Sequence, residues 1–423
     1  MNFTIVFQNG KTCTKDTDDI DSVITVLRKR ISFMHELKSD DVLEFFDHAS
    51  RDLLKNPAFR KDYEMQYAAR FMKRANLEVM LDTALRNRKA LDEFVKLNAT
   101  TTFYHAQPRG LAVFWSAGNV PLLGLFPLIQ ALLTKNVCLV KLSSKAYTDL
   151  VRAAAFLSSV HTEKIQGSEL MRVVTFILLK RDDRETMEKL SMAADIRIAY
   201  GGQESINAIM GLKKRFSTVD IAHGPKYSYA VISKEMLNDS KQWAQKLAID
   251  ISVFEQYACS SPHTVFVERG GKQSPEAFAQ CLAEQLALVC RMIIPKEQEN
   301  PHKTMEILKI KTLYEFKGKV LSSENNEWAV IYSEEEGFAD ACGSRVVFVR
   351  PLDNLNTLRD MNNRNKQTMG LAMPHEKKMG FADTVTLFGI DRCPALGSMN
   401  TYESPWDGTF DIDSMVRWVT CHE

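Results

Sequence analysis

The chain has 423 residues, of which 45% are hydrophobic and 25% are charged, a balance typical of folded globular proteins. Its length exceeds the roughly 250–300 residues at which a single hydrophobic core stops growing, so more than one domain is expected. The 54 basic residues nearly balance the 53 acidic ones, and the absence of long like-charged runs argues against nucleic acid as a partner.

The start of the chain predicts a short strand and a turn, not a basic region followed by an apolar stretch, so secretion is not expected. The longest apolar stretch, residues 111–133, is interrupted by Gly118, Asn119 and Pro121 and does not suit a membrane-spanning helix. The eight cysteines lack CxxC spacing, so neither a metal site nor a disulfide framework is expected. We therefore expect a cytoplasmic protein without a membrane span.

The order of the secondary-structure patterns predicts four parts. Residues 1–100 are rich in helix formers and predict a helical N-terminal region. Residues 101–235 alternate apolar, β-rich runs with helical patterns, which is typical of the parallel sheet in a Rossmann-type cofactor domain. Residues 236–390 continue the alternation and predict a second α/β domain, and residues 391–423 form a C-terminal segment. The expected strands are 110–115, 137–142, 173–179, 196–200, 229–233, 263–268, 328–333 and 345–352.

Cys259 is a candidate nucleophile. It lies directly before an apolar strand, and its neighbours Ala258, Ser260 and Ser261 are small enough to let a substrate carbonyl approach the sulfur. A single cysteine among eight is otherwise more often an inert buried residue, which is the alternative interpretation.

Two further polar residues belong to a strand–turn–helix–strand pattern between residues 110 and 145. Asn119 lies in the turn after the first strand, and Lys141 lies near the end of the second strand. An ordinary turn asparagine and a solvated lysine are the alternatives to a functional role.

From about residue 105 to 423 the chain resembles the aldehyde dehydrogenase superfamily, and more closely the LuxC-type acyl-CoA reductases. The resemblance rests on the order and spacing of SAGNVP, VKLSSK, AYGGQESI, HGPKYSYAVI, FEQYACSSP and GIDRCPALGSMNTYESPWDG. It implies an α/β, aldehyde-dehydrogenase-like fold in which a Rossmann-type cofactor domain is joined to a second α/β catalytic domain.

The resemblance also implies roles for individual residues. Cys259 would be the nucleophile, and Asn119 would donate to the oxyanion of the adduct, an interaction typically worth a few kcal/mol. Lys141 would contact the adenosine ribose, and Gly201 and Gly202 would open the helix beneath the pyrophosphate. A simple tight turn is the alternative for the two glycines.

Hydrolytic aldehyde dehydrogenases use a glutamate to activate water, and here the matching position is Ala222, followed by His223. An enzyme that transfers acyl groups to and from thiols does not need that base, so thioester chemistry is favoured. His223 is a candidate acid or base, and a structural histidine is the alternative.

Many NAD-dependent relatives carry a glutamate three residues after the lysine, where this chain has Ser144 followed by Lys145. A hydroxyl and an ammonium group suit a 2′-phosphate, so NADPH is the expected cofactor. Asp340 lies where the superfamily binds the nicotinamide ribose, with an exposed loop aspartate as the alternative.

We therefore expect NADPH-dependent reduction of an acyl-CoA or acyl-protein thioester, with a fatty acyl group, to an aldehyde through an acyl-enzyme on Cys259. The alternatives are an aldehyde dehydrogenase that forms an acid, and a non-catalytic scaffold subunit of an acyl-activating complex. Expected partners are the thioester substrate, an acyl-transferring or acyl-activating enzyme and, in a homo-oligomer, further copies of the chain.

Overall fold

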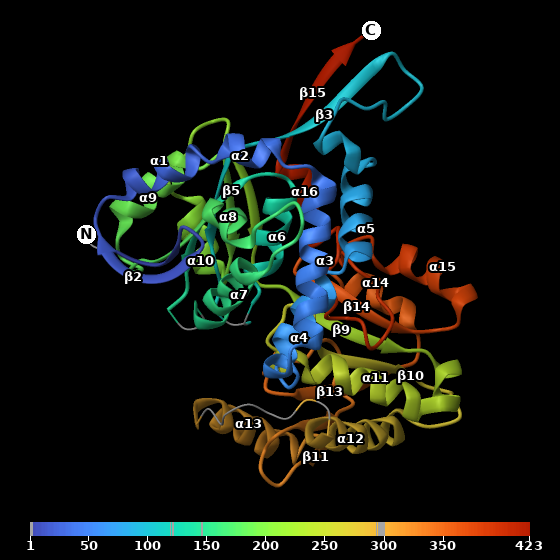
Figure 1. Ribbon diagram of the computed structural model, residues 1–423. Coiled ribbons are helices and arrows are strands. Elements are labelled where there is room, and N and C mark those ends of the chain that lie inside the picture. Colours follow the sequence, from blue (N-terminus) through green and yellow to red (C-terminus); the bar gives the residue numbers. More distant parts are fainter. Residues whose placement is uncertain (1–2, 119, 121, 145–146, 293, 295–300) are drawn as a thin grey trace. The chain divides into compact units, whose positions relative to one another are not determined.

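The structure is a computed structural model that describes residues 3–118, 120, 122–144, 147–292, 294 and 301–423. The chain forms two compact units, each with helices and a largely parallel sheet (Figure 1). Unit 1 comprises Met1–Gly224 and Tyr402–Glu423, and unit 2 comprises Pro225–Thr401. The predicted α/β class is confirmed.

Unit 1 contains a seven-stranded sheet in the order β2-β1-β6-β5-β4-β7-β8. The five strands β4 to β8 are mutually parallel, and β4 consists entirely of buried residues, as expected for a strand covered on both faces. Because the chain moves outward from β4 to β6 and then returns to β7 beside β4, the switch point of the topology, where open α/β sheets bind ligands, lies at the carboxyl ends of β4 and β7. The strands are β1 (Phe3–Gln8), β2 (Lys11–Thr17), β4 (Leu111–Trp115), β5 (Val137–Leu142), β6 (Val174–Leu178), β7 (Ile196–Tyr200) and β8 (Val219–His223).

The helices of unit 1 bury apolar faces against this sheet and against one another. Every residue of α6 is buried, and all of them except Gln130 are apolar. The helices are α1 (Ile20–Arg28), α2 (Ile31–Glu36), α3 (Ser39–Lys55), α4 (Tyr63–Phe71), α5 (Arg74–Leu85), α6 (Leu125–Leu133), α7 (Tyr147–Ser159), α8 (Gly167–Leu170), α9 (Arg184–Ala193), α10 (Gln203–Met210) and α16 (Asp411–Ser414).

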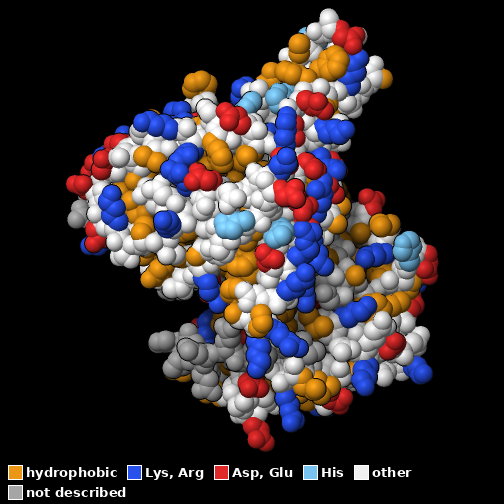
Figure 2. Space-filling model, in the orientation of Figure 1, with side chains coloured by type: hydrophobic (Ala, Val, Ile, Leu, Met, Phe, Trp, Pro, Cys, Tyr) orange, Lys and Arg blue, Asp and Glu red, His pale blue; other side chains and the backbone are white. Residues whose placement is uncertain are grey.

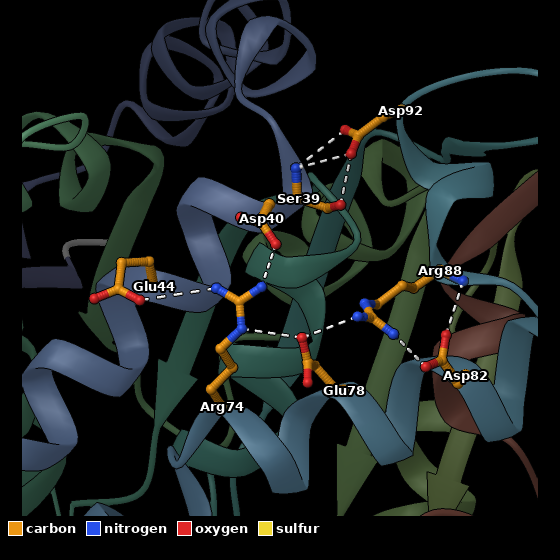
Figure 3. A network of polar contacts seen from close by, with 8 residues as sticks. All are labelled: Ser39, Asp40, Glu44, Arg74, Glu78, Asp82, Arg88 and Asp92. Carbon is orange, nitrogen blue, oxygen red and sulfur yellow. Dashed lines mark hydrogen bonds and ion pairs between the residues drawn. The ribbon is translucent and has the colours of Figure 1, made fainter.

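A network of ion pairs connects α3 with α5 and the turn after α5 (Figure 3). Arg74 and Arg88 share the carboxylate of Glu78, each through an N–O distance of 3.0 Å. Such partly exposed pairs each contribute about 1 kcal/mol or less, so the buried face of α3, with Val42, Phe45 and Phe46, supplies most of the stabilisation.

Unit 1 also contains an antiparallel arm in which β15 (Val416–His422) pairs with β3 (Thr102–Pro108). Tyr104 and Trp418 meet edge to face with their ring centroids 6.5 Å apart. Figure 2 shows hydrophobic side chains gathered over this arm.

Unit 2 contains a six-stranded sheet in the order β11-β12-β13-β10-β9-β14, in which all neighbours except β11 and β12 are parallel. Its strands are β9 (Tyr227–Ile232), β10 (Pro262–Glu268), β11 (Lys319–Ser322), β12 (Ala329–Tyr332), β13 (Val346–Leu352) and β14 (Lys366–Ala372). Its helices are α11 (Ser240–Ser252), α12 (Pro275–Met292), α13 (Pro301–Tyr314), α14 (Leu358–Met361) and α15 (His375–Val385). All eight predicted strands are present close to their predicted bounds.

The structure divides the chain differently from the four predicted parts. The first 100 residues are not separate, because β1 pairs with β6 and extends the sheet of unit 1. Residues 402–423 belong to the same unit, since β15 pairs with β3. The change to unit 2 precedes β9 instead of following residue 235, because β9 pairs with β10 and β14.

Within the described ranges, no helix combines the length and the apolar character needed to cross a membrane. The same residues contain no group of three or more histidine, cysteine, aspartate or glutamate side chains that could hold a metal ion. None of the eight cysteines, all of which the structure describes, forms a disulfide bond.

Candidate active site

A backbone segment with unusual dihedral angles precedes Cys259. Phe254, Glu255 and Gln256 have φ angles of 52°, 51° and 62°, although none of them is glycine. Each such residue costs on the order of 1–3 kcal/mol, so tertiary contacts have to hold the segment. Gln256 supplies two of them, because its Nε2 donates to the carbonyl oxygens of Pro262 at 2.8 Å and Val346 at 2.9 Å.

Arg345 also anchors this segment. Its guanidinium is fully buried, pairs with the carboxylate of Glu255, and donates to the carbonyl oxygen of Ile294 at 2.8 Å. The backbone N–H of Ser344 also donates to the carbonyl oxygen of Glu255 at 2.9 Å. The segment before Cys259 is therefore held by buried polar contacts.

Cys259 lies at the amino edge of the unit 2 sheet, where β10, β9 and β14 begin. Ser228 at the start of β9 donates its hydroxyl to the carbonyl oxygen of Cys259 at 2.6 Å. Gln367 at the start of β14 donates from Nε2 to the Cys259 Sγ atom at 3.3 Å. The thiol is partly exposed while its backbone is fixed, and this combination suits a nucleophile.

Asn400 holds the two serines that follow Cys259. Its Oδ1 accepts hydrogen bonds from Ser260 at 2.7 Å and Ser261 at 3.1 Å, and its Nδ2 donates to the Asp250 carbonyl oxygen at 2.8 Å. Burial raises the pKa of the Asp250 carboxyl to about 7, although the N–H of Gly397, which donates to it at 2.6 Å, acts in the opposite direction. Sequence reasoning missed Asp250 and Asn400, and the only signal for Asn400 was its place within the C-terminal motif.

Four of the predicted cofactor residues lie at the carboxyl edge of the unit 1 sheet. Lys141 lies on β5, and burial, followed by the charge of Arg181, lowers the pKa of its ammonium group. Among the residues that the structure describes, no carboxylate pairs with its Nζ atom, so Lys141 suits an anionic ligand. Ser144 lies two residues beyond β5 and is exposed.

Gly201 and Gly202 connect β7 to the N-terminus of α10, as the resemblance implies. A Cβ atom at Gly202 would meet no atom within 4 Å, so the space beside this helix terminus is open. At Gly201 a Cβ atom would approach the Cβ of Ser205 to 3.2 Å. An open helix N-terminus with unpaired N–H groups fits a phosphate, and these residues therefore fit a dinucleotide.

Of the remaining predicted residues for cofactor binding and the oxyanion, the structure describes Asp340 alone. Asn119 and Lys145 lie outside the described residues. Asp340 is exposed and lies in unit 2, in the segment between β12 and β13. Sequence reasoning missed Arg181, which follows β6 and is exposed; the signal was a basic pair directly after the third strand of the series.

His223 is bound on both sides of its ring. Nδ1 lies 2.7 Å from a carboxylate oxygen of Asp407, and Nε2 lies 2.9 Å from one of Asp411. Burial alone would lower the pKa of His223, but the two carboxylates outweigh burial and raise it to about 9. His223 is therefore held as a cation with both nitrogens occupied, whereas Ala222 beside it on β8 is exposed.

Comparison with known proteins identifies the family. The model of the family described as acyl-CoA reductase (LuxC) matches residues 19–418. The chain belongs to the LuxC acyl-CoA reductase family. This confirms the resemblance seen in the motifs and extends it into the first 100 residues.

Two LuxC relatives are both named long-chain acyl-protein thioester reductase. The protein from Photobacterium phosphoreum is 26% identical over 349 residues, which cover 81% of this chain and 68% of the relative. The protein from Aliivibrio fischeri is 28% identical over 326 residues, which cover 76% of this chain and 65% of the relative. The matches thus span about two thirds of each relative.

Solved structures confirm the aldehyde-dehydrogenase-like fold of this LuxC family member. Aldehyde dehydrogenase 21 from Physcomitrella patens matches with a TM-score of 0.71 and 12% identity, over 99% of this chain and 98% of that chain. A 3,6-anhydro-L-galactose dehydrogenase in complex with NAP matches with a TM-score of 0.65 and 11% identity, over 99% and 96% of the two chains. Family membership makes the chain an aldehyde-forming acyl reductase, and the solved structures show its fold.

Proposed function

We propose that this enzyme reduces a long-chain acyl thioester, carried by CoA or by a protein, to an aldehyde through an acyl group on Cys259, with NADPH as the reductant. The observation that carries the proposal is the environment of Cys259. This residue is partly exposed, its carbonyl oxygen accepts a hydrogen bond from Ser228, and its sulfur accepts one from Nε2 of Gln367. The names of the relatives support a long-chain acyl group and a protein carrier.

The chain's residues support two covalent steps. The Cys259 thiolate adds to the thioester carbonyl, and collapse of the adduct expels the carrier thiolate, which takes up a proton, and leaves an acyl-enzyme. The nicotinamide cofactor, when bound, supplies the hydride that reduces this acyl group. The resulting thiohemiacetal collapses, the electron pair of its C–S bond returns to the Cys259 sulfur, and the aldehyde leaves. Asn119 is the proposed donor to the oxyanion in both adducts.

Water activation is not supported at the position that hydrolytic relatives use. Ala222 has no functional group, and His223 is protonated and held by Asp407 and Asp411. The acyl-enzyme should therefore resist hydrolysis, which favours thioester reduction over acid formation.

Incubation with acyl-CoA in the absence of cofactor is expected to leave one acyl group on Cys259, because the position at which hydrolytic relatives carry their base is Ala222 here. Intact-protein mass spectrometry with peptide mapping measures the adduct, and added NADPH should discharge it as aldehyde. The Ala222→Glu variant should release free acid, whereas the matched Ala222→Gln variant, which cannot act as a base, should not. Rapid acid release by the unaltered enzyme would contradict the proposal.

NADPH is favoured over NADH by the positive charge at the carboxyl edge of the unit 1 sheet. Because β5 and β6 are adjacent and parallel, with Leu142 opposite Leu178, the residues after both strands belong to one edge. Lys141 and Arg181 lie there, close enough for the charge of Arg181 to lower the pKa of Lys141. Two neighbouring cations favour a 2′-phosphate.

The Arg181→Glu variant is expected to weaken NADPH binding by about ten-fold or more and to change NADH binding little, because an attraction to the 2′-phosphate becomes a repulsion. Fluorescence titration with both cofactors measures the two dissociation constants. The matched control is Arg184→Glu, since Arg184 is exposed and already pairs with Glu188. Equal losses for NADPH and NADH would reject the assigned role.

The proposed reaction also indicates the class of enzyme that supplies the acyl group. If the carrier is a protein, an acyl-activating or acyl-transferring enzyme has to form its thioester, because nothing in the chemistry of this reductase activates a free carboxylic acid.

A further inference from the structure

Gln367 is a buried amide directed at the candidate nucleophile. It lies at the start of β14 with no exposed surface, and its Nε2 is 3.3 Å from the Sγ atom of Cys259. Parallel pairing of β14 with β9 brings it to this edge, where Lys366 is opposite Tyr227. Gln367 therefore belongs to a strand of the sheet, at an irregularity of the register between Lys366 and Met369, and not to a connecting loop.

The orientation of the Gln367 amide is set by two neighbours. The guanidinium of Arg392 donates from Nη1 to the Thr368 Oγ1 atom at 3.3 Å, and a guanidinium cannot accept in return. The hydroxyl proton of Thr368 is then available for the Gln367 Oε1 atom, which lies 3.3 Å from Oγ1. With its oxygen engaged in this way, the amide presents its N–H group to sulfur.

The positions of Thr368 and Arg392 are fixed by the backbone. The N–H groups of Asp391 and Arg392 both donate to the carbonyl oxygen of Gln367, at 2.8 and 3.1 Å. Arg392 also donates from Nη2 to the carbonyl oxygen of Thr401 at 2.8 Å. The side chains of Arg392, Thr368 and Gln367 thus form a buried chain of hydrogen bonds that ends at the Cys259 sulfur.

We propose that Gln367 is a further catalytic residue, which stabilises negative charge on the Cys259 sulfur through its N–H group, and that Thr368 and Arg392 are its positioning residues. The proposal rests on the proposed function, because it requires Cys259 to react as a thiolate. A neutral donor favours the charged form of an acceptor, and a hydrogen bond to an anion is roughly twice as strong as one between neutral groups.

The timing of this contribution follows from the charge on sulfur. The sulfur is negative before it attacks the thioester and again when the C–S bond of the thiohemiacetal breaks, but it is neutral in the acyl-enzyme. The N–H of Gln367 therefore assists formation of the thiolate and its departure from the aldehyde carbon. The amide keeps both of its protons throughout, so no proton transfer is assigned to it.

The test measures, as a function of pH, the rate at which iodoacetamide alkylates Cys259 in the folded enzyme. The extent of alkylation is determined afterwards on the peptide that contains Cys259. In the Gln367→Leu variant the midpoint of the profile should move up by about one pH unit, so that alkylation at pH 7 falls about ten-fold. At high pH, where the thiol is ionised in both proteins, the rates should converge. Gln367→Glu should move the midpoint further, because a carboxylate replaces the donor.

If Gln367→Leu folds poorly, a second variant tests the same proposal, and a third variant serves as the control. Thr368→Val preserves the shape of a buried side chain and removes the positioning hydroxyl, so a smaller shift in the same direction is expected. Gln285→Leu is the control, since Gln285 is another buried glutamine of unit 2, on α12, and its profile should match that of the unaltered enzyme.

The outcomes separate this inference from the proposed function. Unchanged profiles in folded Gln367 and Thr368 variants, with Cys259 still acylated by acyl-CoA, would overturn the role of Gln367 alone. Failure of acyl-CoA to acylate Cys259 in the unaltered enzyme would overturn the proposed function and, with it, the catalytic role of Gln367.

Discussion

The Cys259→Ala variant is expected to lose aldehyde formation from acyl thioesters by at least about 10³-fold, because the covalent route has no other nucleophile. The fold should persist, since the substitution removes only a partly exposed sulfur atom. Initial rates of aldehyde production measure the loss, and cofactor titration shows whether unit 1 still binds its ligand.

The matched control is Cys393→Ala, a second cysteine of unit 2. Burial raises the pKa of Cys393 to about 11, so this thiol stays protonated near neutral pH and is not expected to act as a nucleophile. The control should keep its activity. Normal turnover by Cys259→Ala would end the proposed mechanism.

The Arg345→Met variant is expected to lower the free energy of unfolding of unit 2 by about 3–5 kcal/mol, because it leaves the carboxylate of Glu255 without its buried partner. Urea unfolding followed by tryptophan fluorescence measures the change, with Trp243 and Trp328 as reporters in unit 2. Activity should fall as well, since the segment before Cys259 loses its anchor.

Arg269→Met provides the comparison for Arg345→Met. Arg269 pairs with Glu334 and Asp353 at the surface, where 41% of its side chain is exposed, so its loss should cost about 1 kcal/mol or less. Equal unfolding midpoints for the two variants would show that the Arg345 contacts do not stabilise unit 2.

The eight strands expected between residues 110 and 352 were predictable because they are largely buried and therefore appear as continuous apolar runs. Six described strands were missed: β2, β3, β8, β11, β14 and β15. In β14 the reason is that KQTMGLA contains polar and small residues in place of such a run. Because β14 was not predicted, Gln367 was not recognised as a neighbour of Cys259. The two residues are 108 positions apart in the sequence and meet through the pairing of β14 with β9.

Local patterns indicated Cys259 and the turn at Gly201 and Gly202, because each depends on near neighbours in sequence. The role of His223 required partners that lie more than 180 residues away, at Asp407 and Asp411. Contacts of this kind are created by the topology, so a single sequence without the fold cannot identify them.

The discontinuity of unit 1 has a consequence for biosynthesis. The chain leaves the ribosome from its N-terminus, and the whole of unit 2 is made before residues 402–423 appear. The sheet of unit 2 can therefore form during translation, whereas in unit 1 β3 lacks β15 and His223 lacks its two carboxylates until residues 402–423 have been made. Unit 1 is therefore completed after unit 2, so an acyl group taken up by Cys259 before residues 402–423 are made would find the proposed cofactor site incomplete.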